Sequence, residues 1–340
     1  MVIFSQDTLS LLKTFTFRRA WNILRVFFSF YASKWTRSTF HPALPFAISI
    51  EPTTSCNLRC PECPSGLRSF TRPTGMLDTN SFTSFIEQVQ KDISYLIFYF
   101  QGEPYLNPNF LKQVQVAKSY SLYTATSTNA HYLTSEVAKQ TVESGLDRLI
   151  ISIDGTTQET YEQYRVGGQL EKVIEGTKQI LHWKKELKSK TPYVIFQFLV
   201  VGPNEHQVEE IESLGKSLGV DEVRLKTAQI YEYEQGSHLI PKNEKYARYI
   251  KSKDGSYKLK NSLDNHCWKM WHQCVITWDG KVVPCCFDKD AQHTMGNVFQ
   301  TSLKEVWNNK DYQSFRQSIF ESRDQIEICK NCTEGTKVWA

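Results

Sequence analysis

Nine cysteines fall into two groups along the chain, and the first group has the spacing of a metal or cluster site. Cys56, Cys60 and Cys63 form a C-x-x-x-C-x-x-C motif directly after a short apolar run. A structural zinc ion takes four protein ligands, whereas three cysteines can hold a [4Fe–4S] cluster and leave one iron open for an exogenous ligand. The motif therefore favours a cluster with an open iron, and the alternatives are a catalytic zinc site and chance spacing.

The second group lies near the C-terminus and could form another thiolate site. It comprises Cys267, Cys274, Cys285, Cys286, Cys329 and Cys332. Because nine is an odd number, a closed set of disulfides cannot use every thiol, and the start of the chain, whose first charged residue is Asp7, shows no cleavable secretory signal. We therefore expect a reducing cytoplasm, where clustered thiols bind metal or do chemistry.

The segment CVITWDGKVVPCCF within the second group predicts a β-hairpin. Asp279-Gly280 suits a two-residue type I′ turn between its apolar runs. With that turn, Cys274 lies opposite Cys285 on one face, and Cys286 points to the other face. Local geometry thus makes Cys274 a credible ligand and Cys286 the easiest thiol to exclude.

The segments that must position the first group alternate between short apolar runs and helical patterns. This alternation predicts parallel strands joined by crossover helices. We expect strands at 46–51, 95–100, 122–127, 148–153, 193–201 and 222–226, with helices at 78–91, 108–119, 135–144, 158–165, 170–188 and 205–218. Six such units form an α/β fold, an open, partial (β/α)6 TIM-like barrel, whose functional loops follow the carboxyl ends of the strands.

Residues at these strand ends resemble those of a known family. The motif CNLRCPEC after the first strand resembles the signature of the radical S-adenosylmethionine (SAM) superfamily, and later loops are similar to its SAM-binding segments. The matching residues are Gln101, Gly102 and Glu103 after the second strand, Ser127 and Asn129 after the third, Ser152 and Asp154 after the fourth, and Arg165 beyond them. The resemblance implies that SAM chelates the open iron, and that an electron from the cluster cleaves it to methionine and a 5′-deoxyadenosyl radical that abstracts a substrate hydrogen.

The same resemblance implies roles for single residues. Gly102 and Glu103 would hold the SAM amino group, Asn129 would lie near the ribose, and Arg165 would pair with the SAM carboxylate. Glu62 departs from the pattern, because many members carry an aromatic residue there that stacks near the adenine. The adenine contact is therefore unassigned.

The tail resembles the SPASM/twitch extension of the same superfamily, through CWKMW, WDGKVVPCCFD, MGNV, EVW and CKNC. In the shorter, twitch form, the resemblance implies one auxiliary [4Fe–4S] cluster with Cys267, Cys285, Cys329 and Cys332 as ligands. The resemblance favours Cys267 over Cys274 as the fourth ligand. The alternative to a cluster is a zinc site with four cysteine ligands. We expect three parts: an N-terminal amphipathic helical segment at 1–45, the barrel at 46–230, and a linker with the SPASM/twitch domain at 231–340.

Residues 8–38 read as one amphipathic helix with an aromatic stripe. Up to Phe40 the chain carries six basic residues and one acidic residue, Asp7, and charge interrupts the helix too often for it to span a bilayer. The pattern is typical of an interfacial helix that contacts a membrane surface. The alternative is that the helix packs on the main domain and its cations are merely solvated, the commoner arrangement for an amphipathic helix.

We therefore expect a cytoplasmic radical SAM enzyme, peripheral to the membrane at most, with a flavodoxin- or ferredoxin-type electron donor. The balance of 40 basic and 36 acidic residues gives no footprint for nucleic acid. A sugar, a lipid-linked compound or another small metabolite is the expected substrate class, and modification of a peptide or protein is the alternative. A non-catalytic iron–sulfur or zinc protein is the alternative of another class. The motifs name no catalytic acid or base.

Overall fold

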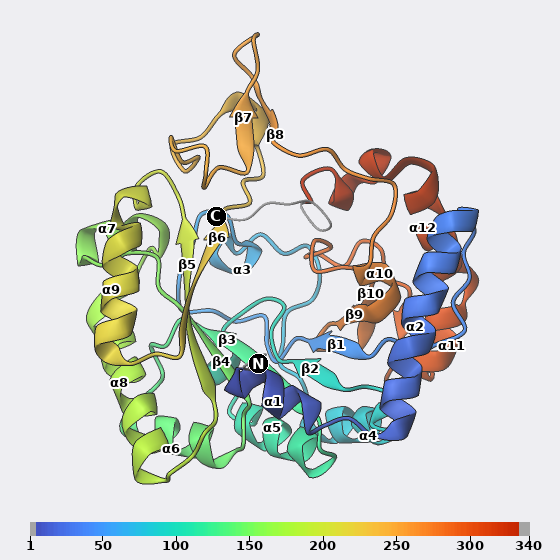
Figure 1. Ribbon diagram of the computed structural model, residues 1–340, viewed down its shortest axis with the longest axis horizontal. Coiled ribbons are helices and arrows are strands. Elements are labelled where there is room, and N and C mark those ends of the chain that lie inside the picture. The colour runs from blue at the N-terminus through green and yellow to red at the C-terminus, as the bar shows by residue number, and fades with distance from the viewer. Residues whose placement is uncertain (1–4, 333–340) are drawn as a thin grey trace, which may run out of the picture.

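The computed structural model describes residues 5–332, which form a nine-stranded sheet with helices on its outer side (Figure 1). Six parallel strands follow one another in chain order: β1 Ala47–Ile50, β2 Tyr95–Ile97, β3 Tyr123–Thr128, β4 Arg148–Ser152, β5 Tyr193–Val200 and β6 Glu222–Thr227. The predicted α/β fold with a partial barrel is thus confirmed. Each strand lies inside its expected range or within one residue of it.

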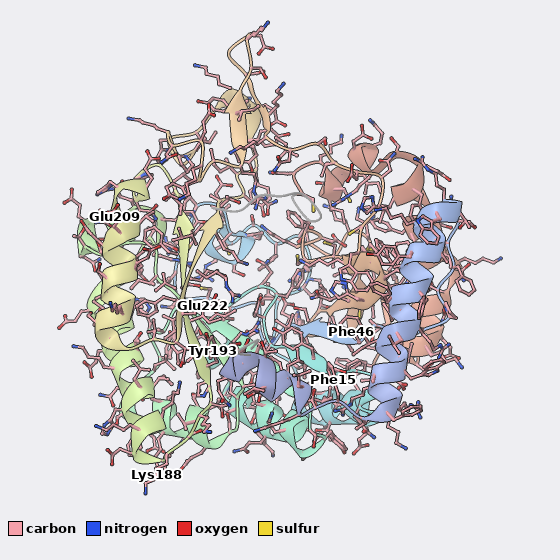
Figure 2. All side chains as sticks on the ribbon, in the orientation of Figure 1. Phe15, Phe46, Lys188, Tyr193, Glu209 and Glu222 are labelled. Carbon is pink, nitrogen blue, oxygen red and sulfur yellow. The ribbon has the colours of Figure 1, made fainter. Side chains whose placement is uncertain are left out.

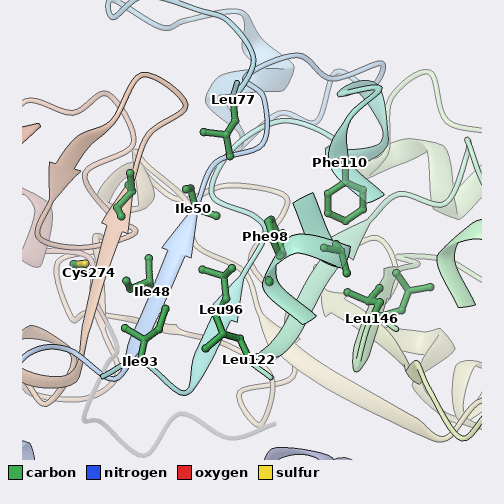
Figure 3. Close-up of a cluster of buried hydrophobic side chains, with 14 of the residues drawn as sticks. Ile48, Ile50, Leu77, Ile93, Leu96, Phe98, Phe110, Leu122, Leu146 and Cys274 are labelled. Carbon is green, nitrogen blue, oxygen red and sulfur yellow. The ribbon is translucent and has the colours of Figure 1, made fainter. Parts of the chain in front are cut away.

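The crossover helices lie between these strands as the sequence predicts. They are α4 Thr79–Val89, α5 Phe110–Ser119, α6 Ser135–Glu143, α7 Gln158–Tyr164, α8 Leu170–Glu186 and α9 Val208–Leu218, with the short helix α3 Pro64–Leu67 after β1. Asp78 and Thr134 accept backbone N–H groups at the starts of α4 and α6, as expected for N-caps. Figure 3 shows the core between sheet and helices, where Ile48, Leu96 and Phe110 are buried.

The C-terminal segment extends the same sheet. Strand β9 Gln273–Ile276 pairs in parallel with β1, β10 Lys281–Val283 pairs antiparallel with β9, and β11 Gly296–Asn297 pairs with β10. Helices α10 Lys269–His272, α11 Leu303–Asn308 and α12 Lys310–Ser322 belong to this segment. Helices α11 and α12 are separated at Asn309, whose side chain accepts the Tyr312 N–H and starts the second helix.

The predicted hairpin forms, but its register is shifted by one residue. Ile276 pairs with Val282, so Cys274 does not lie opposite Cys285. The connection has three residues instead of two, because the Thr277 N–H donates to the Lys281 carbonyl and Gly280 takes a φ of 87°.

The position of Cys286 also differs from the prediction. Strand β10 ends at Val283, and Cys285 and Cys286 follow it in a turn. The alternation of side chains along a strand therefore does not separate these two thiols.

The N-terminal segment forms two helices instead of the single helix expected. They are α1 Gln6–Leu12 and α2 Phe17–Thr36, and Thr16 caps α2 by accepting the Arg19 N–H. Asp7 of α1 binds Tyr123 and Arg148, the first residues of β3 and β4, so α1 covers the amino ends of these strands. Within residues 5–332, no helix is long and apolar enough to cross a membrane.

Between the barrel and the tail, the structure adds a small hairpin that the sequence did not predict. It consists of β7 Tyr249–Lys251 and β8 Tyr257–Leu259 and projects at the top of Figure 1. Short 3-10 helices complete the described chain: η1 Pro104–Leu106, η2 Glu205–Gln207, η3 Tyr233–Gln235, η4 Arg323–Gln325 and η5 Glu327–Cys329.

Candidate functional site

A cavity of about 240 Å³ lies at the carboxyl ends of the barrel strands. Its walls contain most of the site residues that the sequence predicts: Cys56, Cys60, Cys63, Gly102, Glu103, Ser127, Asn129, Ser152 and Arg165. Gln101 and Asp154 are buried beside it, within reach of Cys63 and Arg165 respectively. The fold thus brings residues from four strand ends to one place.

The three thiols of the first group share one wall of this cavity. Burial raises the pKa of Cys56 to about 11 and also raises that of Cys60, with a smaller contribution from Cys63 at each. Thiolates in such a place need compensating positive charge, which an iron–sulfur cluster brings. Among residues 5–332, no three His, Cys, Asp or Glu side chains converge on a single-ion site. The fit to a cluster rests instead on the shared cavity and on the three sulfur donors.

Glu103 is held in a fixed position in the cavity wall. Its carboxylate accepts the Thr128 hydroxyl at 2.7 Å and the Asn129 N–H at 2.8 Å. Burial raises its pKa to about 7, although these hydrogen bonds act in the opposite direction. The preceding residue, Gly102, has a φ of 75°, and a Cβ there would lie 2.2 Å from the Thr53 carbonyl oxygen. Only glycine fits at that position, so the turn that presents Glu103 depends on it.

Arg165 provides the positive charge of the cavity. Its Nε donates to Asp154 at 2.5 Å, and its Nη1 lies 3.8 Å from the Cys60 Sγ. Asp154 also accepts the Leu199 N–H at 2.7 Å, which fixes the carboxylate that orients the guanidinium. Burial raises the Asp154 pKa, and the charge of Arg165 opposes this change. A cation therefore lies between a buried acid and a thiol of the cysteine motif.

The remaining polar residues form a rim of hydroxyl and amide groups. The hydroxyls of Ser127 and Ser152 lie 3.4 Å apart, and the Asn129 side-chain amide donates to Asn57 at 2.8 Å. Gln197 also lines the cavity, opposite Ser152 in the β4–β5 pairing.

The sequence analysis missed Gln197, although one signal could have found it. Gln197 is the polar residue in the apolar run of β5, Tyr193–Val200, two positions from Leu199, which also lines the cavity. Glu62, which the family pattern left without a role, accepts the Tyr231 N–H at 2.9 Å.

The second cysteine group divides into thiols that lie near one another and Cys274, which lies apart from them. Cys267, Cys329 and Cys332 all lie near Arg323, whose Nη2 is 3.3 Å from the Cys332 Sγ. Cys285 in turn interacts with Cys332. Its hydrogen bond with Cys286 and its burial raise the Cys285 pKa well above the ordinary value. The four thiols that the resemblance implies are therefore neighbours.

Cys274, in contrast, is a core residue. It pairs with Ile48 across β9 and β1 and is fully buried among apolar side chains, as Figure 3 shows. Burial raises its pKa to about 12, and Arg316 is the charged group that acts on it. The arrangement favours Cys267 over Cys274 as the fourth ligand.

Cys286, a member of the second cysteine group, lies on the side toward the first group instead of pointing away from it. Its thiol is 3.7 Å from the Lys269 Nζ and interacts with Cys285. Cys286 also interacts electrostatically with Lys289, and Cys63 of the first group interacts with the same lysine. The expectation that Cys286 lies apart from the site is wrong, because the strand ends before it.

Comparison with known proteins identifies two domains. The family model of the radical SAM superfamily matches residues 50–215, and that of SPASM, an iron–sulfur cluster-binding domain, matches residues 267–333. The tungsten-containing aldehyde ferredoxin oxidoreductase cofactor-modifying protein of Pyrococcus furiosus is 27% identical over 300 residues, which are 78% of this chain and 82% of that protein. The AdoMet-dependent heme synthase of Methanosarcina barkeri is 23% identical over 320 residues, 84% of this chain and 88% of that protein.

A solved structure supports the fold. Streptococcus suis SuiB bound to S-adenosylmethionine superposes with a TM-score of 0.63 over 99% of this chain and 80% of that chain, at 14% identity. The similarity extends through both matched domains.

Proposed function

Since the chain is a radical SAM enzyme with a C-terminal SPASM iron–sulfur domain, we propose that it binds SAM against a [4Fe–4S] cluster in the cavity described above. The observation that carries this proposal is that three thiols line the same 240 Å³ cavity as Glu103 and Arg165. When bound, the cluster supplies the electron that cleaves SAM to methionine and a 5′-deoxyadenosyl radical, which takes a hydrogen atom from the substrate.

Cys56, Cys60 and Cys63 would hold the cluster and leave one iron for SAM. The Arg165 guanidinium, 3.8 Å from the Cys60 Sγ, stabilises the thiolate form that a ligand needs.

The charges of the cavity match those of the amino acid part of SAM. The Glu103 carboxylate would accept hydrogen bonds from the SAM amino group, and Arg165 would share its donors between Asp154 and the SAM carboxylate. Ser127, Ser152 and Asn129, with Gln101 behind the cysteine loop, complete the proposed binding residues. The two serine hydroxyls and the Asn129 amide suit the ribose hydroxyls.

We assign one auxiliary [4Fe–4S] cluster to Cys267, Cys285, Cys329 and Cys332, with a role in electron transfer or substrate binding. Arg323 supports this assignment, because it places positive charge beside three of the four thiols. A flavodoxin- or ferredoxin-type protein would supply the electrons.

The substrate class that we favour is a small non-peptide molecule, such as a sugar or a lipid-linked intermediate. The N-terminal segment consists of the two helices α1 and α2, with no compact sheet-containing module among residues 5–45 that could recognise a peptide. Similar proteins include a cofactor-modifying protein, a heme synthase and a 2-deoxy-scyllo-inosamine dehydrogenase, whose names agree with this class, but also a PqqA peptide cyclase, so modification of a peptide stays the alternative.

The test is anaerobic reconstitution with iron and sulfide, followed by addition of SAM and dithionite. We expect the wild-type protein to release 5′-deoxyadenosine and the Cys60→Ala variant to release none, because the variant loses a cluster ligand. Circular dichroism should show that the variant is folded. Equal 5′-deoxyadenosine release by the two proteins would exclude this site, and cluster-loaded wild-type protein that cleaves no SAM would favour an electron carrier.

A further inference from the structure

Helix α2 turns its polar side toward the protein and its apolar side outward. The residues facing the protein are Arg19, Asn22, Val26, Ser29, Phe30 and Ser33. The exposed large apolar residues of α2 are Phe17, Trp21, Leu24, Phe27, Phe28, Tyr31 and Trp35. Phe27 lies to one side, against Trp268, and we call the other six the aromatic stripe. They follow one another at intervals of three or four residues and therefore form one continuous line along the helix. Phe17 is 90% exposed and Trp35 is 81% exposed.

Polar contacts fix this orientation. The Arg19 guanidinium donates to the Gln90 carbonyl at 2.7 Å, and to Tyr120 and Ser121 carbonyls at 2.8 Å each. The Asn22 amide donates to the Leu44 carbonyl at 2.9 Å. Rotating the helix to bury the aromatic stripe would break these bonds in a buried place, at high cost. The helix does pack on the rest of the protein, as the alternative expected, through these contacts and through the buried side chains of Val26 and Phe30, but the aromatic stripe stays exposed.

The charges around the aromatic stripe all have one sign. The exposed cations of the segment are Lys13, Arg18, Arg25, Lys34 and Arg37. Its one acidic residue, Asp7, is 7% exposed and pairs with Arg148. Arg18 pairs with Asp92 of the barrel, and the other four cations have no acidic partner within the segment.

The apolar surface continues beyond α2. Leu9, Leu12 and Phe15 are 40%, 43% and 39% exposed, which extends it through the joint to α1. Figure 2 labels Phe15 at this joint, and Figure 1 shows α2 along the right-hand edge of the molecule. The two helices thus present aromatic residues and cations together.

We propose that α1 and α2 dock this enzyme on the surface of an anionic lipid bilayer. Tryptophan, tyrosine and phenylalanine side chains partition into the headgroup region, and lysine and arginine side chains are attracted to anionic lipids. A second copy of the chain fits less well, because pairing two such faces would bring cations together without an acid from this segment.

The docking face and the SAM cavity have no residue in common. Asp7 fastens α1 at the amino ends of β3 and β4, whereas the cavity lies at the carboxyl ends. Docking through α1 and α2 therefore leaves the SAM-binding residues untouched. Variants of the docking face can be tested without altering the site.

The experiment uses the full chain with vesicles of phosphatidylcholine, with and without phosphatidylserine. We expect co-sedimentation with the anionic vesicles and a loss of binding as salt rises. Trp21→Ser with Trp35→Ser should weaken binding on the order of tenfold or more, because two aromatic side chains no longer enter the bilayer. Lys13→Gln with Lys34→Gln should weaken binding roughly 25-fold, on the order of fivefold for each cation, and only on anionic vesicles.

Matched controls lie on other helices. Lys178→Gln with Lys216→Gln removes two exposed cations of α8 and α9, and Leu187→Ser removes an exposed apolar side chain; both should bind like the wild type. Thermal melting and 5′-deoxyadenosine release should be unchanged in the tryptophan variant. Absence of wild-type binding to anionic vesicles would overturn the proposal. The proposal would also be overturned if light scattering showed that the wild type is a dimer and the tryptophan variant a monomer, while the two proteins bound vesicles equally.

Discussion

The proposed contact between Glu103 and the SAM amino group predicts that SAM binding depends on pH. Burial raises its pKa to about 7, so the side chain is largely a carboxylate above pH 7 and largely protonated below it. Only the ionised form can accept hydrogen bonds from the SAM amino group at both oxygens. We therefore expect SAM affinity to fall as the pH decreases through 7.

The Glu103→Gln variant separates this effect from other titrations. It should keep the cluster, weaken SAM binding at pH 8 by roughly 1.5–3 kcal/mol, and lose the change of affinity around pH 7. Anaerobic calorimetry of the cluster-loaded proteins at pH 6 and pH 8 measures both quantities. The assigned role would be contradicted if the two proteins had the same affinity at pH 8.

The residues of the SAM cavity were largely predictable because parallel strands bring their carboxyl ends together. Cys60, Glu103 and Arg165 were found from motifs at those ends, and all three line one cavity. Gln197 was missed because no motif surrounds it. The direction of Cys286 was misjudged because β10 ends at Val283, before both Cys285 and Cys286, so the alternation of a strand does not apply to them.

At the level of elements, Arg19 and Arg18 offer a matched pair of substitutions on α2. Arg19→Met leaves buried carbonyl groups of Gln90, Tyr120 and Ser121 without a donor, which should reduce the free energy of unfolding by about 3 kcal/mol or more. Arg18→Met removes an ion pair with Asp92 whose arginine side chain is 61% exposed, and should cost about 1 kcal/mol or less.

Urea unfolding followed by circular dichroism measures the difference between the two variants. A larger loss for Arg18→Met would show that the buried hydrogen bonds of Arg19 do not anchor the helix. Hydrogen exchange should localise the loosening in Arg19→Met to α1 and α2, because this side chain joins Thr14, between the two helices, to the carbonyls of Gln90 and Tyr120.

The errors in the predicted elements have causes that lie outside each element. Asp279-Gly280 suits a two-residue turn, yet the backbone N–H of Trp278 donates to Glu51 at 3.2 Å and its indole to the Pro73 carbonyl at 3.2 Å. These contacts across the sheet favour the three-residue connection. They join segments more than 200 residues apart, which a local pattern does not contain.

For the whole molecule, the SPASM segment is joined to the barrel through a shared core. Strand β9 adds to the edge of β1, and one cluster of buried residues includes Ile48 of the barrel with Trp271 and Trp307 of the tail. The division into parts at 1–45, 46–230 and 231–340 stays a prediction. The continuous sheet means that cutting near Tyr231 should expose the edge of β1 and much of the core.

The auxiliary cluster can be tested by counting iron. Two cubane clusters require about eight irons per chain, and Cys56, Cys60 and Cys63 changed together to Ala should leave about four. In that background, Cys285→Ala, Cys329→Ala or Cys332→Ala should each lose the remaining iron. Cys286→Ala should retain it, because the four assigned ligands are still present.

The pair Cys267→Ala and Cys274→Ala distinguishes the two candidates for the fourth ligand. Cys267 lies beside Arg323 with Cys329 and Cys332, so its loss should remove the cluster, whereas Cys274 lies in the apolar core and its loss should leave about four irons. Iron and sulfide analysis with electron paramagnetic resonance of the reduced protein measures this. The opposite result would move the ligand onto β9. A tail that purifies anaerobically with one zinc and no iron would refute the auxiliary cluster, and the SAM cavity would then have to act without it.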